Sequence, residues 1–215
     1  MDRIRFVSAV KIIEKRYVER ERKAVPFEIL IHGILSTRTK DTTTFPAQKR
    51  LLSKANTPER IASMPLREIE NLIYPVGFYK TKAKLLKAAC RFLIANFNSR
   101  VPDNKPDLIS IPGVGPKVAS LVLEWGFNMP FIAVDTHVNR IVQRLGFIPA
   151  GTKPEKTESI LEKFLDDDTK KKINFSFVRF GREICRPLNP LCSKCPVYNY
   201  CEFKLKEKYF TKSKT

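Results

Sequence analysis

The chain has 215 residues, with 40 lysines and arginines against 22 aspartates and glutamates, which gives a formal net charge of +18. A chain of this length can fold as one large domain or two smaller ones. It contains no run of about 18 apolar residues, so no membrane-spanning helix is predicted. The charge favours a polyanionic partner such as nucleic acid, although lysine-rich surfaces also serve solubility or heat resistance.

Apolar residues spaced three or four apart predict helices along the chain. The first is expected over residues 3–20, the second from Pro26 and the third from Asp41, with Asp41 as its cap. Short helices are expected to begin near Pro58 and Pro65, and a long helix ends near Phe97. Later helices are expected before and after residues 111–115, from Asp135 to Leu145, from Pro154, and from Phe175 towards Ile184. Strand signals are nearly absent, so the fold class is predicted as all-α.

Three smaller expectations follow from local composition. Asp107 is expected to cap the helix before residue 111, and residues 166–172 form a charged, solvated loop. Cys90 lies on an apolar helix face and is expected to be an inert core residue. The first residues, Met-Asp-Arg-Ile-Arg, hold no apolar stretch, which argues against a secretory signal, so an intracellular protein is expected.

The segment Ile111-Pro-Gly-Val-Gly-Pro-Lys117 predicts a tight turn that leads directly into a helix. Gly113 and Gly115 tolerate positive φ and let another backbone come close. Such a turn directs backbone N–H groups and the positive helix end outward, where a phosphate can bind. The pattern is typical of a helix-hairpin-helix element.

Lys117 falls in the first turn of this helix, where a cation is disfavoured. The same field favours the uncharged amine, which makes Lys117 a candidate nucleophile for Schiff-base chemistry. Taken alone, a lysine at this position is more often one that contacts a phosphate than a nucleophile. Asp135 precedes another helical run, so on its own it is a candidate N-cap.

Four of the five cysteines follow the pattern Cys-x6-Cys-x2-Cys-x5-Cys, at Cys185, Cys192, Cys195 and Cys201. Without a secretory signal, this spacing indicates a four-thiolate metal site in preference to a disulfide framework. Ligand type leaves zinc and a [4Fe–4S] cluster equally open, since both accept four cysteines.

Five segments together resemble endonuclease III, of the helix-hairpin-helix DNA glycosylase superfamily, over roughly residues 6–201. They are residues 35–41 (LSTRTKD), 76–83 (VGFYKTKA), 111–117 (IPGVGPK), 134–137 (VDTH) and the cysteine loop. The resemblance implies a six-helix barrel domain over residues 22–133. An iron–sulfur cluster domain would combine residues 1–21 with 134–215, and the active site would lie in the cleft between the two domains.

The resemblance also implies roles for individual residues. Lys117 would attack C1′ of a damaged nucleotide, Asp135 would assist it, and Cys185, Cys192, Cys195 and Cys201 would hold a mainly structural [4Fe–4S] cluster. Arg38 stands where relatives usually carry a glutamine that fills the gap left by the flipped nucleotide, and Phe78 matches a residue that wedges into the base stack. The remaining expected DNA contacts are Gly113, Val114, Gly115, His137, Arg186 and Lys194, with His137 the residue most easily explained by a local hydrogen bond.

The expected function is that of a bifunctional DNA glycosylase and abasic-site lyase for oxidised pyrimidines such as thymine glycol. The expected partner is double-stranded DNA with damaged bases or abasic sites, the expected oligomeric state is a monomer, and the expected location is cytoplasmic or nuclear. Two alternatives remain open. One is a mismatch glycosylase that removes uracil or thymine opposite guanine, and the other is a DNA-binding or redox-signalling protein without catalysis.

Overall fold

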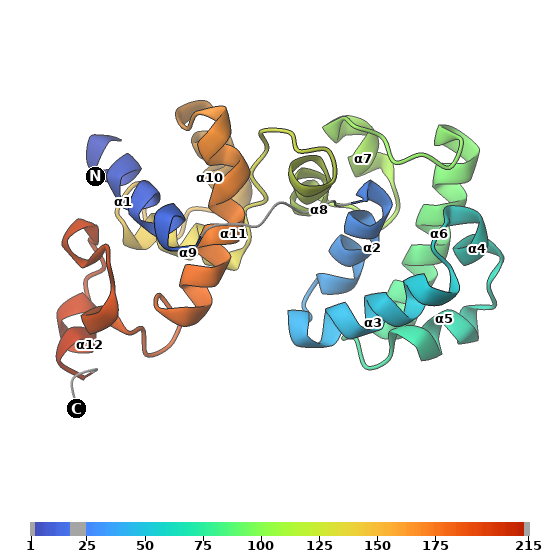
Figure 1. Ribbon diagram of the computed structural model, residues 1–215, viewed down its shortest axis with the longest axis horizontal. Helices are drawn as coiled ribbons and strands as arrows, with labels where there is room; N and C mark the ends of the chain where they lie inside the picture. The colour runs from blue at the N-terminus through green and yellow to red at the C-terminus, as the bar shows by residue number, and fades with distance from the viewer. Residues whose placement is uncertain (1–2, 18–24, 213–215) are drawn as a thin grey trace. The chain divides into compact units, whose positions relative to one another are not determined.

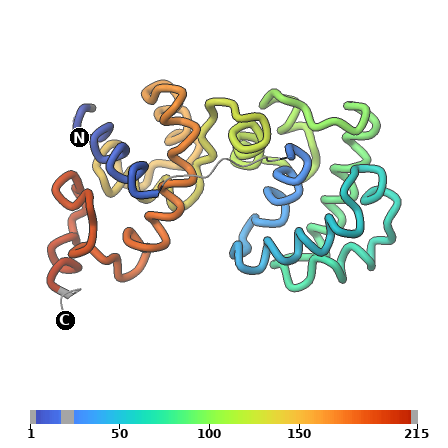
Figure 2. Tube along the Cα trace, viewed as in Figure 1, coloured from blue at the N-terminus to red at the C-terminus, as the bar shows by residue number. Residues whose placement is uncertain are grey.

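The structure, a computed structural model, describes residues 3–17 and 25–212. Within those ranges the chain consists of helices and loops and contains no strand, so the all-α prediction is confirmed. The described residues divide into two compact units (Figures 1 and 2). Residues 25–129 form the first, called here the hairpin unit, and residues 3–17 with 130–212 form the second, the cysteine unit.

The hairpin unit is built around its first helix, α2 (Pro26–Ser36). Most of this helix is buried, including five of its apolar side chains: Phe27, Leu30, Ile31, Ile34 and Leu35. A helix with so wide an apolar face must be covered by others. It packs against α3, α6, α8 and the π-helical turn η1. The other elements of this unit are α3 (Asp41–Lys54), α4 (Pro58–Ser63), α5 (Leu66–Ile73), α6 (Tyr79–Phe97), α7 (Lys105–Ser110), α8 (Pro116–Leu121) and η1 (Val122–Gly126).

Two predicted helix caps were wrong. Asn104 caps α7, accepting the Asp107 amide at 3.0 Å, while its own amide group donates to the Asp107 carboxylate at 2.8 Å. Asp107 therefore occupies the third helical position, where an acidic side chain reaches back to the cap. Asp41 is the first residue of α3, and Lys40 precedes it as the N-cap residue, without a capping hydrogen bond from its side chain.

The cysteine unit has α1 (Arg3–Arg16), α9 (Thr136–Arg144) and α11 (Asp167–Glu183) at its centre. Their apolar faces share one core with Ile132 and Val134, which is why residues 130–133 group with this unit and not with the hairpin unit. The remaining elements are α10 (Pro154–Phe164), the 3-10 turns η2 (Cys192–Lys194) and η3 (Tyr198–Tyr200), and α12 (Lys206–Lys212). The helix expected over residues 3–20 is described to Arg16, and the expected domain boundary at residue 22 lies outside the described residues.

The prediction of a charged loop over residues 166–172 was wrong, because α11 begins there. Asp166 caps this helix by accepting the Thr169 amide at 2.8 Å. Asp167 and Asp168 follow in its first turn, where the positive helix end stabilises acidic side chains. Cys90 lies fully buried in α6, as predicted, and burial raises its pKa to about 12. None of the helices described is both long and apolar enough to cross a membrane.

Candidate active site and metal centre

Lys117 is the second residue of α8, directly after the turn formed by residues 111–115. The Val114 amide closes the turn on Ile111 O at 3.0 Å. Gly113 has a φ of +85°, which a residue with a side chain rarely adopts. Gly115 differs from the expectation: its φ is −100°, and a Cβ added there would meet nothing within 4 Å. The side chain of Lys117 is half-buried.

The helix that carries Lys117 is held firmly in the hairpin unit. Val118 and Ala119 are buried, and α8 packs against both α2 and α7. After Leu121 the helix continues as the π-helical turn η1, which the sequence did not indicate. Such turns occur frequently at functional sites.

Two further loops of the same unit carry Arg38 and Phe78. Both residues are exposed and both have positive φ, at 52° and 58°. The loops touch: a Cβ on Gly77 would lie 3.1 Å from Thr39 Oγ1 and 3.3 Å from Arg38 O. The two adjoining loops therefore present an exposed apolar side chain, that of Phe78, and an exposed cation, that of Arg38.

Asp135 is the N-cap of α9 in the cysteine unit. Its Oδ1 accepts the amides of His137 at 2.8 Å and Val138 at 2.9 Å, as expected for a cap. His137 is half-buried, and burial lowers its pKa; its Nδ1 lies 3.1 Å from Arg140 Nη2. Lys117 and Asp135 thus belong to different units, each at the first turn of a helix.

The four cysteines of the loop line one open pocket in the cysteine unit. Burial raises the pKa of Cys192 to about 11 and that of Cys195 to about 12, and it also raises the pKa of Cys201. A metal centre held here must deprotonate these sulfurs, because the thiolate and not the thiol is the metal ligand. Among the residues described, no three His, Cys, Asp or Glu side chains are grouped as ligands of a single metal ion.

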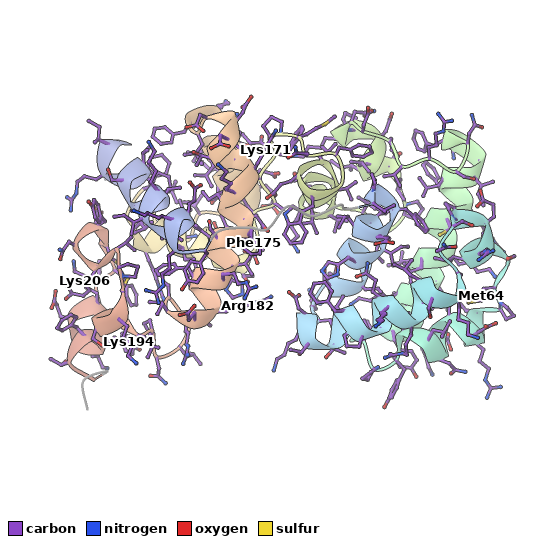
Figure 3. All side chains as sticks on the ribbon, viewed as in Figure 1. Met64, Lys171, Phe175, Arg182, Lys194 and Lys206 are labelled. Atoms are coloured by element: carbon purple, nitrogen blue, oxygen red, sulfur yellow. The ribbon has the colours of Figure 1, made fainter. Side chains whose placement is uncertain are left out.

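Two cations border the pocket. Arg144 Nη1 donates to Cys185 Sγ at 3.4 Å and to Arg186 O at 2.7 Å, and its guanidinium lies over the Phe203 ring. Lys206 Nζ donates to Cys201 O at 2.7 Å. Figure 3 labels Lys206 together with Lys194, an exposed residue of η2. Positive groups at this position suit an anionic centre.

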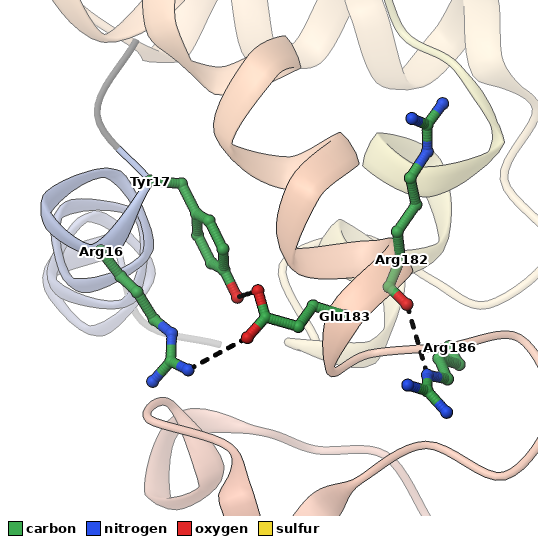
Figure 4. A network of polar contacts seen from close by, with 5 residues as sticks. All are labelled: Arg16, Tyr17, Arg182, Glu183 and Arg186. Carbon is green, nitrogen blue, oxygen red and sulfur yellow. Dashed lines mark hydrogen bonds and ion pairs between the residues drawn. The ribbon is translucent and has the colours of Figure 1, made fainter. Parts of the chain in front are cut away.

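Contacts at the end of α11 fix the start of the cysteine loop (Figure 4). The Glu183 carboxylate accepts the Tyr17 hydroxyl at 2.8 Å and the Arg16 guanidinium at 3.3 Å. Arg186 is exposed, and its Nε donates to Arg182 O at 3.3 Å. Arg186 is therefore held near the first cysteine while its guanidinium remains accessible.

Comparisons with known proteins agree with these features. The model of the HhH-GPD superfamily, described as base excision DNA repair proteins, matches residues 31–167. The chain belongs to this superfamily. It is 43% identical over 191 residues to an endonuclease III from Thermotoga maritima, with 89% of each chain covered.

Solved structures of endonuclease III have the same fold as this HhH-GPD protein. A trapped endonuclease III–DNA covalent intermediate superposes with a TM-score of 0.90 and 31% identity, covering 97% of this chain and 98% of the other. A non-covalent endonuclease III–DNA complex gives a TM-score of 0.91 at 30% identity, covering 98% and 99%. The protein is thus a base excision DNA repair protein with the helix-hairpin-helix glycosylase fold.

The sequence did not single out Lys82, Arg140 or Arg144 in this HhH-GPD protein. Each donates to backbone carbonyls at least 41 residues away in the chain. Arg140 Nη2, for example, donates to Gly181 O at 3.1 Å and to Cys185 O at 2.9 Å. Because the acceptors are backbone atoms of distant segments, no local sequence signal could have identified these residues.

Proposed function

We propose that this protein is a bifunctional DNA glycosylase and abasic-site lyase that excises oxidised pyrimidines of the thymine glycol type, with Lys117 as its nucleophile. The observation that carries the proposal is the match to a trapped covalent intermediate between endonuclease III and DNA. A covalent intermediate requires a nucleophilic side chain. Lys117 provides an amine at the first turn of α8, directly after the helix-hairpin-helix turn.

The first step is the extrusion of the damaged nucleotide, because a base inside a duplex cannot be attacked at C1′. Phe78 supplies an apolar side chain, 64% exposed, that can enter the stack. Arg38 supplies N–H donors that can face the base left unpaired. The turn at residues 113–115 holds a backbone phosphate. Since the Val114 amide is used within the turn, the amides of Gly113 and Gly115 make that contact.

The chemical step is attack by the neutral Nζ of Lys117 on C1′. The C1′–N bond breaks, the base leaves with the electron pair and takes up a proton, and the sugar ring opens to give a Schiff base with the lysine. Loss of a C2′ proton then breaks the C3′–O bond, so the strand is nicked 3′ to the lesion by β-elimination. Nucleophilic catalysis of this kind replaces one difficult step with two easier ones.

Asp135 accepts a proton from Lys117 and stabilises the positive charge that develops on the sugar. One carboxylate oxygen, Oδ1, is held by two amides of α9, which fixes the orientation of the group. A carboxylate fixed by backbone donors stays in place while charge develops nearby. His137 is half-buried beside Arg140, which favours a positioning role near the DNA backbone over proton transfer.

The cysteine centre is proposed to hold a [4Fe–4S] cluster through Cys185, Cys192, Cys195 and Cys201. The four residues line one pocket bordered by Arg144 and Lys206, cations that suit the negative charge of a centre held by four thiolates. The bound cluster would cross-link the loop and take no part in the reaction. Arg186 and Lys194, both exposed on this loop, are then placed to contact phosphates.

The test is borohydride trapping on three duplexes that carry thymine glycol, an abasic site or a G·U pair. We expect a covalent adduct with the first two duplexes, and none with the Lys117→Ala variant, which still binds DNA. Lys54→Ala serves as the control, since Lys54 is an exposed lysine at the end of α3 in the same unit. A preference for the G·U duplex would instead favour a mismatch glycosylase.

Two other outcomes would contradict parts of the proposal. Full strand nicking by Lys117→Ala would show that another group is the nucleophile. Turnover of none of the three duplexes would favour a DNA-binding protein without catalysis. Because its substrate is genomic DNA, the protein is proposed to act in the cytoplasm of a prokaryote or the nucleus of a eukaryote.

A further inference from the structure

Lys82 is a buried lysine in the first turn of α6, with only 5% of its surface exposed. Both features are unfavourable, because burial removes water from the ammonium group and the start of a helix repels a cation. Burial lowers its pKa to about 8, so the group remains charged at neutral pH. A residue in so unfavourable a position must be compensated by specific contacts.

The compensation comes from the loop that carries Arg38. Lys82 Nζ donates to Leu35 O at 2.7 Å, to Thr37 O at 2.6 Å and to Thr39 Oγ1 at 2.9 Å. An ammonium group has three N–H donors, and all three are used. Two of the acceptors, Thr37 O and Thr39 Oγ1, belong to the residues on either side of Arg38. The side chain of Lys82 thus fixes the backbone that presents Arg38.

The main chain of the same residue supports the other candidate DNA contact. The Lys82 amide donates to Phe78 O at 3.0 Å, so Phe78 is held at the start of α6. Gly77 brings the two loops into direct contact, since a Cβ there would lie 3.1 Å from Thr39 Oγ1. One residue therefore links the turn of Phe78 and the loop of Arg38, and the close approach at Gly77 joins them a second time.

We propose that Lys82 is a positioning residue for lesion extrusion, which holds Arg38 and Phe78 in one fixed relation so that they meet the duplex together. This inference rests on the proposed function, in which Phe78 enters the stack and Arg38 faces the unpaired base. The simpler explanation is that Lys82 only satisfies the last carbonyls of α2, which have no partner within the helix. In that case its loss would lower stability and affect every substrate equally.

The two explanations are separated by comparing duplex with single-stranded substrates. A single strand that carries an abasic site needs no extrusion and leaves no unpaired base, yet it still requires Lys117. The readout is the single-turnover nicking rate with saturating enzyme, for an abasic site in a duplex and in a single strand. In the Lys82→Met variant we expect the duplex rate to fall by about 10- to 100-fold, because the two contacts are misplaced. The single-strand rate should stay within about twofold, since it depends on the nucleophile alone.

The matched control is Lys87→Met, on the same helix. The Lys87 ammonium also donates to a backbone carbonyl, that of Met64 at the end of α4 (Figure 3), and the hydrogen bonds described for it include none to either loop. We expect the ratio of duplex to single-strand rates to be unchanged. If Lys82→Met does not fold, Thr39→Val removes only one acceptor with little change of shape. It should lower the duplex rate by about 2- to 10-fold and leave the single-strand rate unchanged.

Three results would overturn the inference. Equal losses on both substrates would reduce Lys82 to a structural residue, and an unaffected duplex rate in a folded Lys82→Met variant would remove its role. A wild-type protein that nicks neither substrate would overturn the proposed function, and the positioning role with it. The wild-type protein nicks DNA in the first two cases and not in the third, so failure of the inference can be told apart from failure of the proposed function.

Discussion

Asp135 combines a structural and a proposed chemical role that can be separated by substitution. Its Oδ1 caps α9 by accepting two amides, and this needs only an oxygen acceptor. Its proposed assistance to Lys117 needs a negative charge. Asparagine keeps the acceptor and loses the charge, whereas alanine loses both.

We therefore expect Asp135→Asn to fold with a free energy of unfolding within about 0.5 kcal/mol of the wild type. Its nicking rate at an abasic site should fall by about 100-fold or more, as for the loss of a proton acceptor. Asp135→Ala should lose activity and, in addition, about 1 kcal/mol of stability. Urea unfolding and single-turnover nicking measure the two effects.

Asn104→Ala is the control, because it removes the cap of α7 without touching either proposed catalytic group. It should cost about 1 kcal/mol and leave nicking nearly unchanged. If Asp135→Asn nicks DNA as fast as the wild type, the carboxylate has no chemical role and Asp135 is only a cap.

The contrast between Asp135 and Lys82 shows which residues a sequence can identify. The cap of Asp135 was predicted correctly because the amides that donate to it lie only two and three residues along the chain. The buried ammonium of Lys82 contacts Leu35, which is 47 residues away. A lysine in a helical pattern is ordinarily assigned to the surface, so only the folded chain reveals its burial.

The turn before α8 illustrates how two glycines in one motif differ. Gly113 needs its φ of +85°, and a Cβ there would approach Leu85 Cβ to 3.3 Å. Gly115 has extended backbone and open space around it. The proposed function explains the second glycine differently: a Cβ would occupy space through which a DNA phosphate reaches the amides.

Alanine substitutions should separate these two reasons. Gly113→Ala is expected to destabilise the hairpin unit by about 1–2 kcal/mol, because it forces a left-handed conformation on a residue with a side chain. Gly115→Ala should leave stability unchanged or slightly higher, yet weaken the binding of an abasic-site duplex by about tenfold. Urea unfolding and fluorescence anisotropy measure these effects. Equal DNA affinity for Gly115→Ala and wild type would remove the phosphate contact from this turn.

Helices were predicted more reliably than their first residues. Those that begin at Pro26, Pro58 and Pro154 were identified because proline suits the first turn. The start of α11 was missed because Asp166, Asp167 and Asp168 look like a solvated charge run, although the positive helix end stabilises them. The π-helical turn η1, which follows α8 and packs against α2, carries no local sequence signal that predicts it.

The net charge of +18 predicts strong but salt-sensitive binding to DNA. Each phosphate that a cation neutralises adds about 0.9 to the slope of log affinity against log salt concentration. Contacts to base edges instead determine which bases are preferred. The exposed cations Arg38 and Lys194 are proposed for these two different kinds of contact, one in each unit.

For Lys194→Gln we expect the slope of log affinity against log salt concentration to decrease by about 1, with the affinity for all duplexes weakened alike.

For Arg38→Gln we expect the ranking of the four bases opposite the lesion to change. Any preference for guanine should be reduced by about tenfold, because arginine donates to the acceptors of guanine. Anisotropy titrations at several salt concentrations and single-turnover rates on four duplexes measure these effects. The control is Lys54→Gln, at an exposed position on α3, which should leave the base ranking unchanged, as should Lys194→Gln.

One outcome would contradict the role of Arg38 in reading the base. If wild type and Arg38→Gln process all four duplexes at equal rates, while Arg38→Gln shows a reduced salt slope, Arg38 is a phosphate contact. The charge of the molecule would then account for its affinity without contributing to its choice of lesion.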